Sequence, residues 1–159
     1  MFAKIKVHTL QIAILNIYAS PHANLNNILN VIAKALYQLD LNNITIILGD
    51  FNIDMVHCNP KTKQLETYMQ NYNLHFLVDK TNSMNKSLID HVWANLGNIK
   101  YRIFVVDAYW SDHDVLSLVL DLWYTHETVY KIPNFYIFAI PHWFYHIYFT
   151  KANYNIFLW

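Results

Sequence analysis

The chain has 159 residues, a length typical of one domain, so two full-sized domains are not expected. Its 11 basic and 11 acidic side chains cancel, which excludes a generally basic surface that attracts nucleic acid; a polyanion would need a local site or a metal ion. Hydrophobic residues make up 55% of the chain, too large a share for a disordered protein. The single cysteine, Cys58, excludes an intramolecular disulfide and a zinc site made of cysteines alone.

Aromatic residues are concentrated near the C-terminus. Residues 123–159 hold 14 of the 26 Trp, Tyr and Phe residues, and residues 132–150 contain no Asp, Glu, Lys or Arg. We therefore expect a domain over residues 1–122, a boundary near Leu122, and an aromatic-rich tail over residues 123–159. This tail could be an unpacked appendage, a strand or helix lying on the core, or a membrane contact, although two prolines interrupt its apolar stretch.

The first part of the chain predicts strands alternating with helices. The start of the chain is interpreted as a strand, because polar residues break its apolar run. Residues 9–18 are mostly aliphatic and predict a buried strand. Apolar residues then recur every three or four positions from Leu25 to Leu39, which indicates a helix with Asn24 as its N-cap. The β-branched run 44–48 predicts a buried strand whose end carries polar residues.

The remaining elements are predicted from similar patterns. Pro60 is well placed to begin a second helix, with Leu65, Tyr68 and Met69 on one face. Further strands are expected at residues 74–78, 88–93, 101–106 and 115–120.

Polar residues suited to phosphate chemistry stand near the ends of these strands. Asp50 and Asn52 are two positions apart, so in an extended segment they point the same way and can together orient a water molecule and a phosphate oxygen. Tyr18 offers a phenol for a phosphate oxygen. Taken alone, Gly49-Asp50 is more often a turn, and a tyrosine is more often part of the core.

A second group of residues centres on a histidine. Asp90 lies inside an apolar strand, where an unpaired charge is costly, so it needs a partner. Asp112, a candidate metal ligand, and His113 stand side by side on a predicted loop, and an Asp90–His113 pair would fix the imidazole tautomer. Alone, Asp90 could cap a strand, Asp112 could be solvated, and His113 could be a packing residue.

Two other groups are weaker candidates for metal binding. His142 and His146 have helical spacing but no third ligand, and the neighbouring His57 and Cys58 offer no more.

Four segments in this order resemble the endonuclease/exonuclease/phosphatase superfamily, and especially the endonuclease domains of mobile elements of the non-LTR retrotransposon or Helitron type. The resemblance covers roughly residues 9–122 and is carried by NIYASP, ILGDFN, SLIDHVWAN and YWSDHDVLSLVL. It implies an α/β fold, a four-layered sandwich of two mixed sheets with flanking helices, of which this chain would supply the C-terminal half. It also implies cleavage of phosphate esters with Mg²⁺ or Mn²⁺.

The same resemblance implies a role for each matching residue. Asp50 would help to activate the attacking water, and Asn52 would bind phosphate and orient Asp50. Asp112 would ligate the metal, and His113 would contact the scissile phosphate and stabilise its developing charge. Asp90 would hold His113. The remaining residue, Tyr18, matches a tyrosine that contacts phosphate in some members.

The sequence also departs from the family pattern. An early Asn and a Glu that is a principal metal ligand have no counterpart here, so we expect an impaired, truncated mobile-element remnant that binds DNA weakly. The alternatives are a non-catalytic interaction module that self-associates through an exposed apolar sheet face, and a membrane-associated protein anchored by residues 132–150. No signal in the sequence assigns a compartment, and the family interpretation would place the chain inside the cell.

Overall fold

The computed structural model describes residues 2–7, 10–39, 44–79, 87–106 and 113–121, together with the backbone of three later strands. The chain divides into two compact units. The first contains residues 1–95 and 155–159, and the second contains residues 96–154. Each unit is described by itself below.

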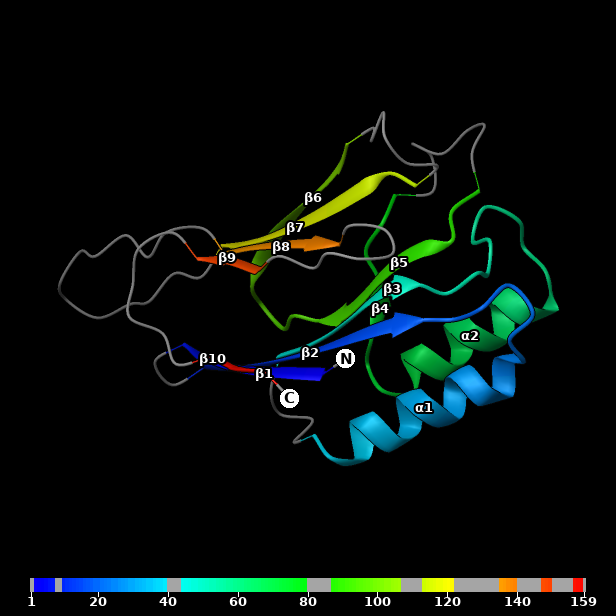
Figure 1. Cartoon of the computed structure of the whole chain (residues 1–159), viewed down its shortest axis with the longest axis horizontal. Helices are drawn as coiled ribbons and strands as arrows, with labels where there is room; N and C mark the ends of the chain where they lie inside the picture. Colours follow the sequence, from blue (N-terminus) through cyan, green and yellow to red (C-terminus); the bar gives the residue numbers. More distant parts are fainter. Residues whose placement is uncertain are drawn as a thin grey trace, which may run out of the picture. The chain divides into compact units, whose positions relative to one another are not determined.

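The first unit is built on a mixed six-stranded sheet (Figure 1). Its strand order is β10-β1-β2-β3-β5-β4, where β2 and β3 are parallel and every other neighbouring pair is antiparallel. The strands are β1 (Phe2–Val7), β2 (Leu10–Tyr18), β3 (Ile44–Asp50), β4 (His75–Phe76), β5 (Asp90–Asn95) and β10 (Ile156–Leu158). With two helices beside this sheet, the predicted α/β class is confirmed. The predicted four-layered stacking involves both units and stays a prediction.

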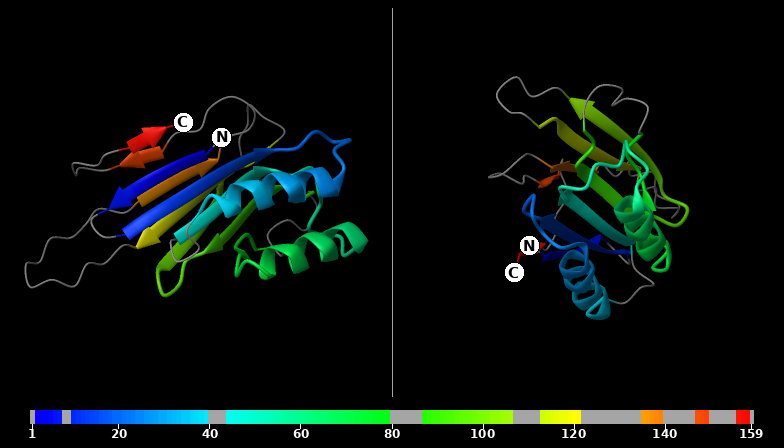
Figure 2. Two further views of the ribbon diagram at one scale, coloured as in Figure 1. Left: turned by 90° about the horizontal axis from the view of Figure 1, so that it is seen from below. Right: turned by 90° about the vertical axis from the view of Figure 1, so that its right-hand side faces the viewer.

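Helices α1 (Leu25–Tyr37) and α2 (Pro60–Gln70) lie side by side on one face of this sheet (Figure 1 and Figure 2). The predicted apolar stripe of α1 is buried, and Asn24 caps the helix by accepting a hydrogen bond from the backbone N–H of Asn26 at 2.9 Å. Helix α2 begins with a capping box between Asn59 and Thr62. Local capping and burial of the apolar face therefore account for both helices.

A tyrosine connects the two helices. The Tyr68 hydroxyl on α2 donates to the Leu29 carbonyl on α1 at 3.2 Å. Burial, with a smaller contribution from a hydrogen bond to Tyr72, raises the pKa of Tyr68 to about 12. The hydroxyl therefore stays protonated, and able to donate, over the ordinary pH range.

We expect the variant Tyr68→Phe to lose about 1 kcal/mol of stability at neutral pH, because the hydrogen bond to Leu29 is removed. Since the pKa of Tyr68 is raised by folding, its contribution is complete below pH 10 and is lost as the pH rises through about 12. Urea unfolding at pH 8 and at alkaline pH measures the difference between wild type and variant. A difference that grows with pH would contradict this assignment.

The core of the first unit includes residues of its central strand and of both helices. Ile46 and Ile47 of β3, Leu65 and Met69 of α2, and Ile32 of α1 are fully buried. Strand β3 is buried along all but its last residue, as its uninterrupted β-branched sequence predicts. A buried central strand of this kind gives a rigid support for the polar residues that follow it.

The second unit is a four-stranded antiparallel sheet in the order β6-β7-β8-β9. Its strands are β6 (Lys100–Val106), β7 (Val115–Asp121), β8 (Phe135–Ala139) and β9 (Ile147–Phe149). The predicted aromatic tail thus contributes β8 and β9 here and β10 to the first unit, while the domain boundary near Leu122 stays a prediction. Among the described residues, no helix is both long and apolar enough to cross a membrane.

Candidate active site

Three strands of the first unit bring predicted site residues into one row. Tyr18 of β2 is the partner of Asp50 in the parallel pairing with β3, and Asp50 is the partner of Asp90 in the antiparallel pairing with β5. Because residues directly opposite one another on paired strands share a face, the three side chains leave the sheet on the same side. Tyr18 is 59% exposed, and both acids are half-buried. This end of the sheet is therefore accessible to a ligand.

The two acids face each other closely. The N–H of Phe51 donates to the Ile89 carbonyl at 2.9 Å, which makes Asp50 and Asp90 a non-hydrogen-bonded pair, the arrangement with the shorter separation between strands. Two carboxylates in this position repel each other unless a proton, a donor or a cation lies near them. For Asp50, Asn52 supplies such donors.

Asn52 holds both oxygens of Asp50. Its backbone N–H donates to Oδ1 of Asp50 at 2.9 Å, and its side-chain Nδ2 donates to Oδ2 at 3.0 Å. The same Nδ2 donates to the Ala19 carbonyl at 2.7 Å, so Asn52 also ties this corner to the end of β2. Asn52 has φ +49°, a left-handed conformation that asparagine tolerates better than most residues. Asn52 is therefore placed to orient the carboxylate of Asp50.

Gly49 brings β3 against β2 just before this corner. Its φ is +132°, and a Cβ atom built there would lie 1.9 Å from the Ile17 carbonyl oxygen and 2.7 Å from Oδ1 of Asn16. Only a residue without a side chain fits this approach. The glycine of the predicted Gly49-Asp50 turn thus serves a close contact between strands.

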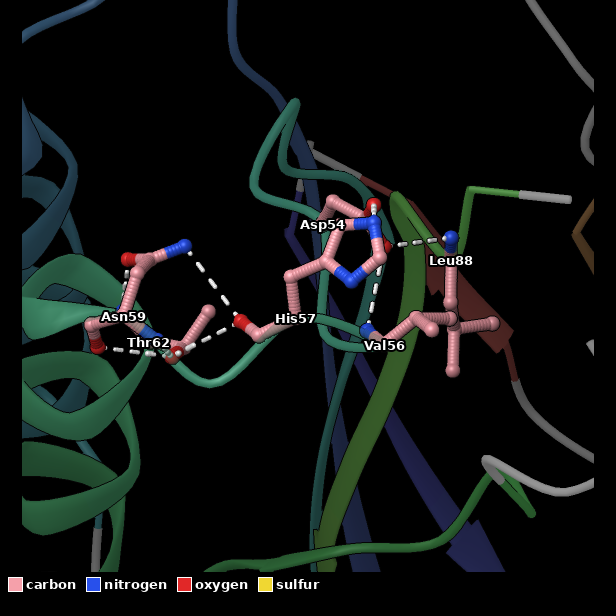
Figure 3. A network of polar contacts seen from close by, with 6 residues as sticks. All are labelled: Asp54, Val56, His57, Asn59, Thr62 and Leu88. Carbon is pink, nitrogen blue, oxygen red and sulfur yellow. Dashed lines mark hydrogen bonds and ion pairs between the residues drawn. The ribbon is translucent and has the colours of Figure 1, made fainter.

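Asp54 ties the loop after β3 to the segment that enters β5 (Figure 3). Its Oδ1 accepts from the N–H of Leu88 at 2.9 Å and from the N–H of Val56 at 3.0 Å, while its Oδ2 lies 3.8 Å from Nε2 of His57. The N–H of Met55 donates back to the Leu88 carbonyl at 3.0 Å. Asp54 therefore holds together the two segments that carry Asp50 and Asp90.

The variant Asp54→Ala is expected to lose about 2 kcal/mol of stability or more, because two backbone N–H groups lose a charged acceptor. Asp54→Asn keeps one acceptor oxygen and should lose less. Urea unfolding of the three proteins measures both values. Equal stability of Asp54→Ala and wild type would show that these hydrogen bonds contribute nothing net.

The other predicted site residues are placed only in part. Asp112 lies outside the described residues, as do His142 and His146. His113 is half-buried in the second unit, whereas Asp90 belongs to the first, so their pairing stays a prediction. Cys58 is exposed. Within the described residues, no group of three or more His, Cys, Asp or Glu side chains is arranged to bind a metal ion.

Sequence reasoning gave no role to His91, the residue after Asp90. Its side chain is completely buried, and its Nε2 lies 2.8 Å from the Ile53 carbonyl oxygen. A signal existed in the sequence, because a histidine in the apolar segment SLIDHVWAN needs hydrogen-bond partners if that segment is buried.

Comparisons with known proteins agree with this fold. Residues 12–117, more than half of the chain, match the family described as "Endonuclease-reverse transcriptase". Among solved structures, the chain is similar to the "Endonuclease domain of TRAS1, a telomere-specific non-LTR retrotransposon", with 19% sequence identity and a TM-score of 0.58. That match covers 71% of this chain and 57% of the TRAS1 chain. A comparison with curated proteins finds no match.

The mixed sheet, its two helices and the segments at its end define an endonuclease/exonuclease/phosphatase-type domain. The chain belongs to the endonuclease–reverse transcriptase family. The resemblance inferred from the four sequence segments is therefore confirmed, while the role of each site residue stays a prediction. The family is one of nucleases, and self-association and membrane contact have no support among the described residues.

Proposed function

We propose that this chain is a divalent-metal-dependent phosphodiesterase of endonuclease type that acts on DNA. The observation that carries this proposal is the Asp50 carboxylate, both of whose oxygens are held by Asn52 in a row with Tyr18 and Asp90. Two acids and a phenol at an accessible sheet end suit the positioning of a water molecule beside a phosphate.

In this proposal each side chain has a defined role. Asp50 takes a proton from the attacking water, and Asn52 keeps Asp50 oriented and contacts the phosphate. Tyr18 donates its phenol O–H to a phosphate oxygen, and His113, oriented by Asp90, stabilises the charge that develops on the phosphate. These tasks follow the resemblance, and the contacts between Asn52 and Asp50 support one of them, the orientation of Asp50 by Asn52.

Mg²⁺ or Mn²⁺ fits the donor chemistry of this proposal. Asp50, Asp90 and Asp112 all carry carboxylate oxygens, the ligands that such hard cations prefer. Asp112 would hold the ion, which, when bound, would polarise a phosphoryl oxygen and offset charge in a protein without net charge. Because the chain has no net positive charge, binding to DNA is expected to be weak and to fall steeply with salt.

Nicking of supercoiled plasmid DNA by the full 159-residue chain tests this proposal. We expect slow nicking with Mg²⁺ or Mn²⁺, none with EDTA, and a loss of about 100-fold or more in Asp50→Asn, because the carboxylate that takes the proton is gone. Asp121→Asn is the matched control, since it makes the same change at the end of β7, where Asp121 pairs with the exposed Arg102. Absence of nicking by a folded chain would favour a non-catalytic interaction module.

A further inference from the structure

A buried aromatic cluster surrounds His91 on β5. The His91 ring stacks on Phe51, with ring centroids 4.5 Å apart and planes inclined by 17°. Phe76 of β4 meets the His91 ring edge-on at 5.4 Å and also packs at 4.8 Å against Trp93. His91 and Trp93 are 0% and 1% exposed. Solvent therefore cannot replace the hydrogen bonds that His91 makes inside this cluster.

The partners of His91 fix its tautomer. Trp93 Nε1 lies 3.3 Å from Nδ1 of His91, and because an indole N–H can only donate, Nδ1 must accept. The proton of the neutral ring is then on Nε2, which donates to the Ile53 carbonyl at 2.8 Å. The pair of contacts thus sets the orientation of the ring as well as its protonation.

These contacts lie on both sides of Asn52. His91 stacks on the side chain of Phe51, the residue before Asn52, and donates a hydrogen bond to the carbonyl of Ile53, the residue after Asn52. Asn52 itself has a left-handed backbone, which costs energy and persists only where neighbouring contacts hold it. His91 therefore holds the two neighbours of the residue that orients Asp50.

We propose that His91 is a positioning residue that, with Trp93, holds the Phe51–Ile53 loop so that Asn52 keeps both hydrogen bonds to Asp50. The effect on catalysis rests on the proposed function, whereas the effect on the geometry of Asn52 does not. His91 follows Asp90 directly on a strand, so their side chains leave opposite faces of the sheet. His91 thus acts on the site from the buried face.

The test compares His91→Phe with Thr45→Val in the full chain by native-state hydrogen exchange. Phenylalanine at position 91 keeps the stacking but removes both hydrogen bonds. Thr45→Val is the control, because Thr45 is a buried polar residue near the start of β3, the strand that ends at Asp50. We expect exchange of the Asn52 N–H to accelerate about 10-fold or more in His91→Phe, beyond any change at Ile46 and Ile47. The ¹H–¹⁵N signals of the Asn52 side-chain amide should shift in the same variant only.

Equal protection of Asn52 in His91→Phe and Thr45→Val would overturn the inference. If His91→Phe does not fold, Trp93→Phe decides in its place, because it keeps an aromatic ring at this position but removes the donor to Nδ1. Selective loss of protection at Asn52 supports the proposal, and no selective loss overturns it. A wild-type chain that nicks no DNA would contradict the proposed function alone, since the exchange comparison still decides the role of His91.

Discussion

Gly49→Ala is expected to cost about 4 kcal/mol or more, the largest loss of stability among single substitutions considered for this chain. A Cβ at this position would lie 1.9 Å from the Ile17 carbonyl oxygen, a backbone atom that can move only with strand β2. The φ of +132° adds backbone strain for any residue with a side chain. Since β2 and β3 are neighbours at the centre of the sheet, the first unit should be largely unfolded.

Gly97→Ala provides the matched control, because Gly97 also has a positive φ, +55°, but a Cβ there would meet nothing within 4 Å. Strain alone should then cost about 1 kcal/mol. Urea unfolding followed by circular dichroism measures both variants. If Gly49→Ala lost no more stability than Gly97→Ala, the result would contradict the close contact between β3 and β2 at Gly49.

Asn52→Ala is expected to reduce plasmid nicking by about 100-fold or more, the largest effect expected on activity from a residue other than the acids. The substitution removes the side-chain amide that donates to Oδ2 of Asp50 and to the Ala19 carbonyl. It also leaves alanine with a left-handed backbone at φ +49°, which favours movement of the loop. Asp50 would then lose its fixed orientation toward the attacking water.

Asn59→Ala separates this effect from a general loss of stability. The side-chain oxygen of Asn59 caps α2 by accepting from the N–H groups of Lys61 and Thr62, so its loss should cost about 1 kcal/mol without touching Asp50. Nicking rates at a temperature where both variants are folded give the comparison. Similar rates for Asn52→Ala and Asn59→Ala would contradict the assigned role of Asn52.

Elements with strong local signals were predicted well from the sequence. The apolar periodicity and the N-cap Asn24 located α1, and Pro60 marked the start of α2. Strand limits were less certain, because pairing with neighbours decides where a strand ends: β4 is limited to His75–Phe76, and β5 begins at Asp90, two residues after the predicted start. Strand β3 extends through Asp50 because Tyr18 and Asp90 pair with that residue.

The candidate site was predictable as a set of residues but not as a set of contacts. Motif spacing identified Tyr18, Asp50, Asn52 and Asp90, and the sheet register places three of them in one row. The support beneath them was not predictable, because the hydrogen bonds from His91 to Ile53 and from Leu88 to Asp54 join residues more than 30 positions apart. Such contacts are set by tertiary packing and leave only a weak local signal.

We propose that the sheet end carrying Asp50 and Asn52 belongs to a metal-dependent phosphodiester site. Titration of the ¹⁵N-labelled full chain with Mn²⁺, followed by paramagnetic broadening of its amide signals, tests this claim without relying on activity. We predict that broadening begins at residues 50–52, at Asp90 and at residues 112–114, and that excess Mg²⁺ reverses it. Broadening confined to other acidic residues, such as Asp54 and Glu66, or none at all would contradict the account.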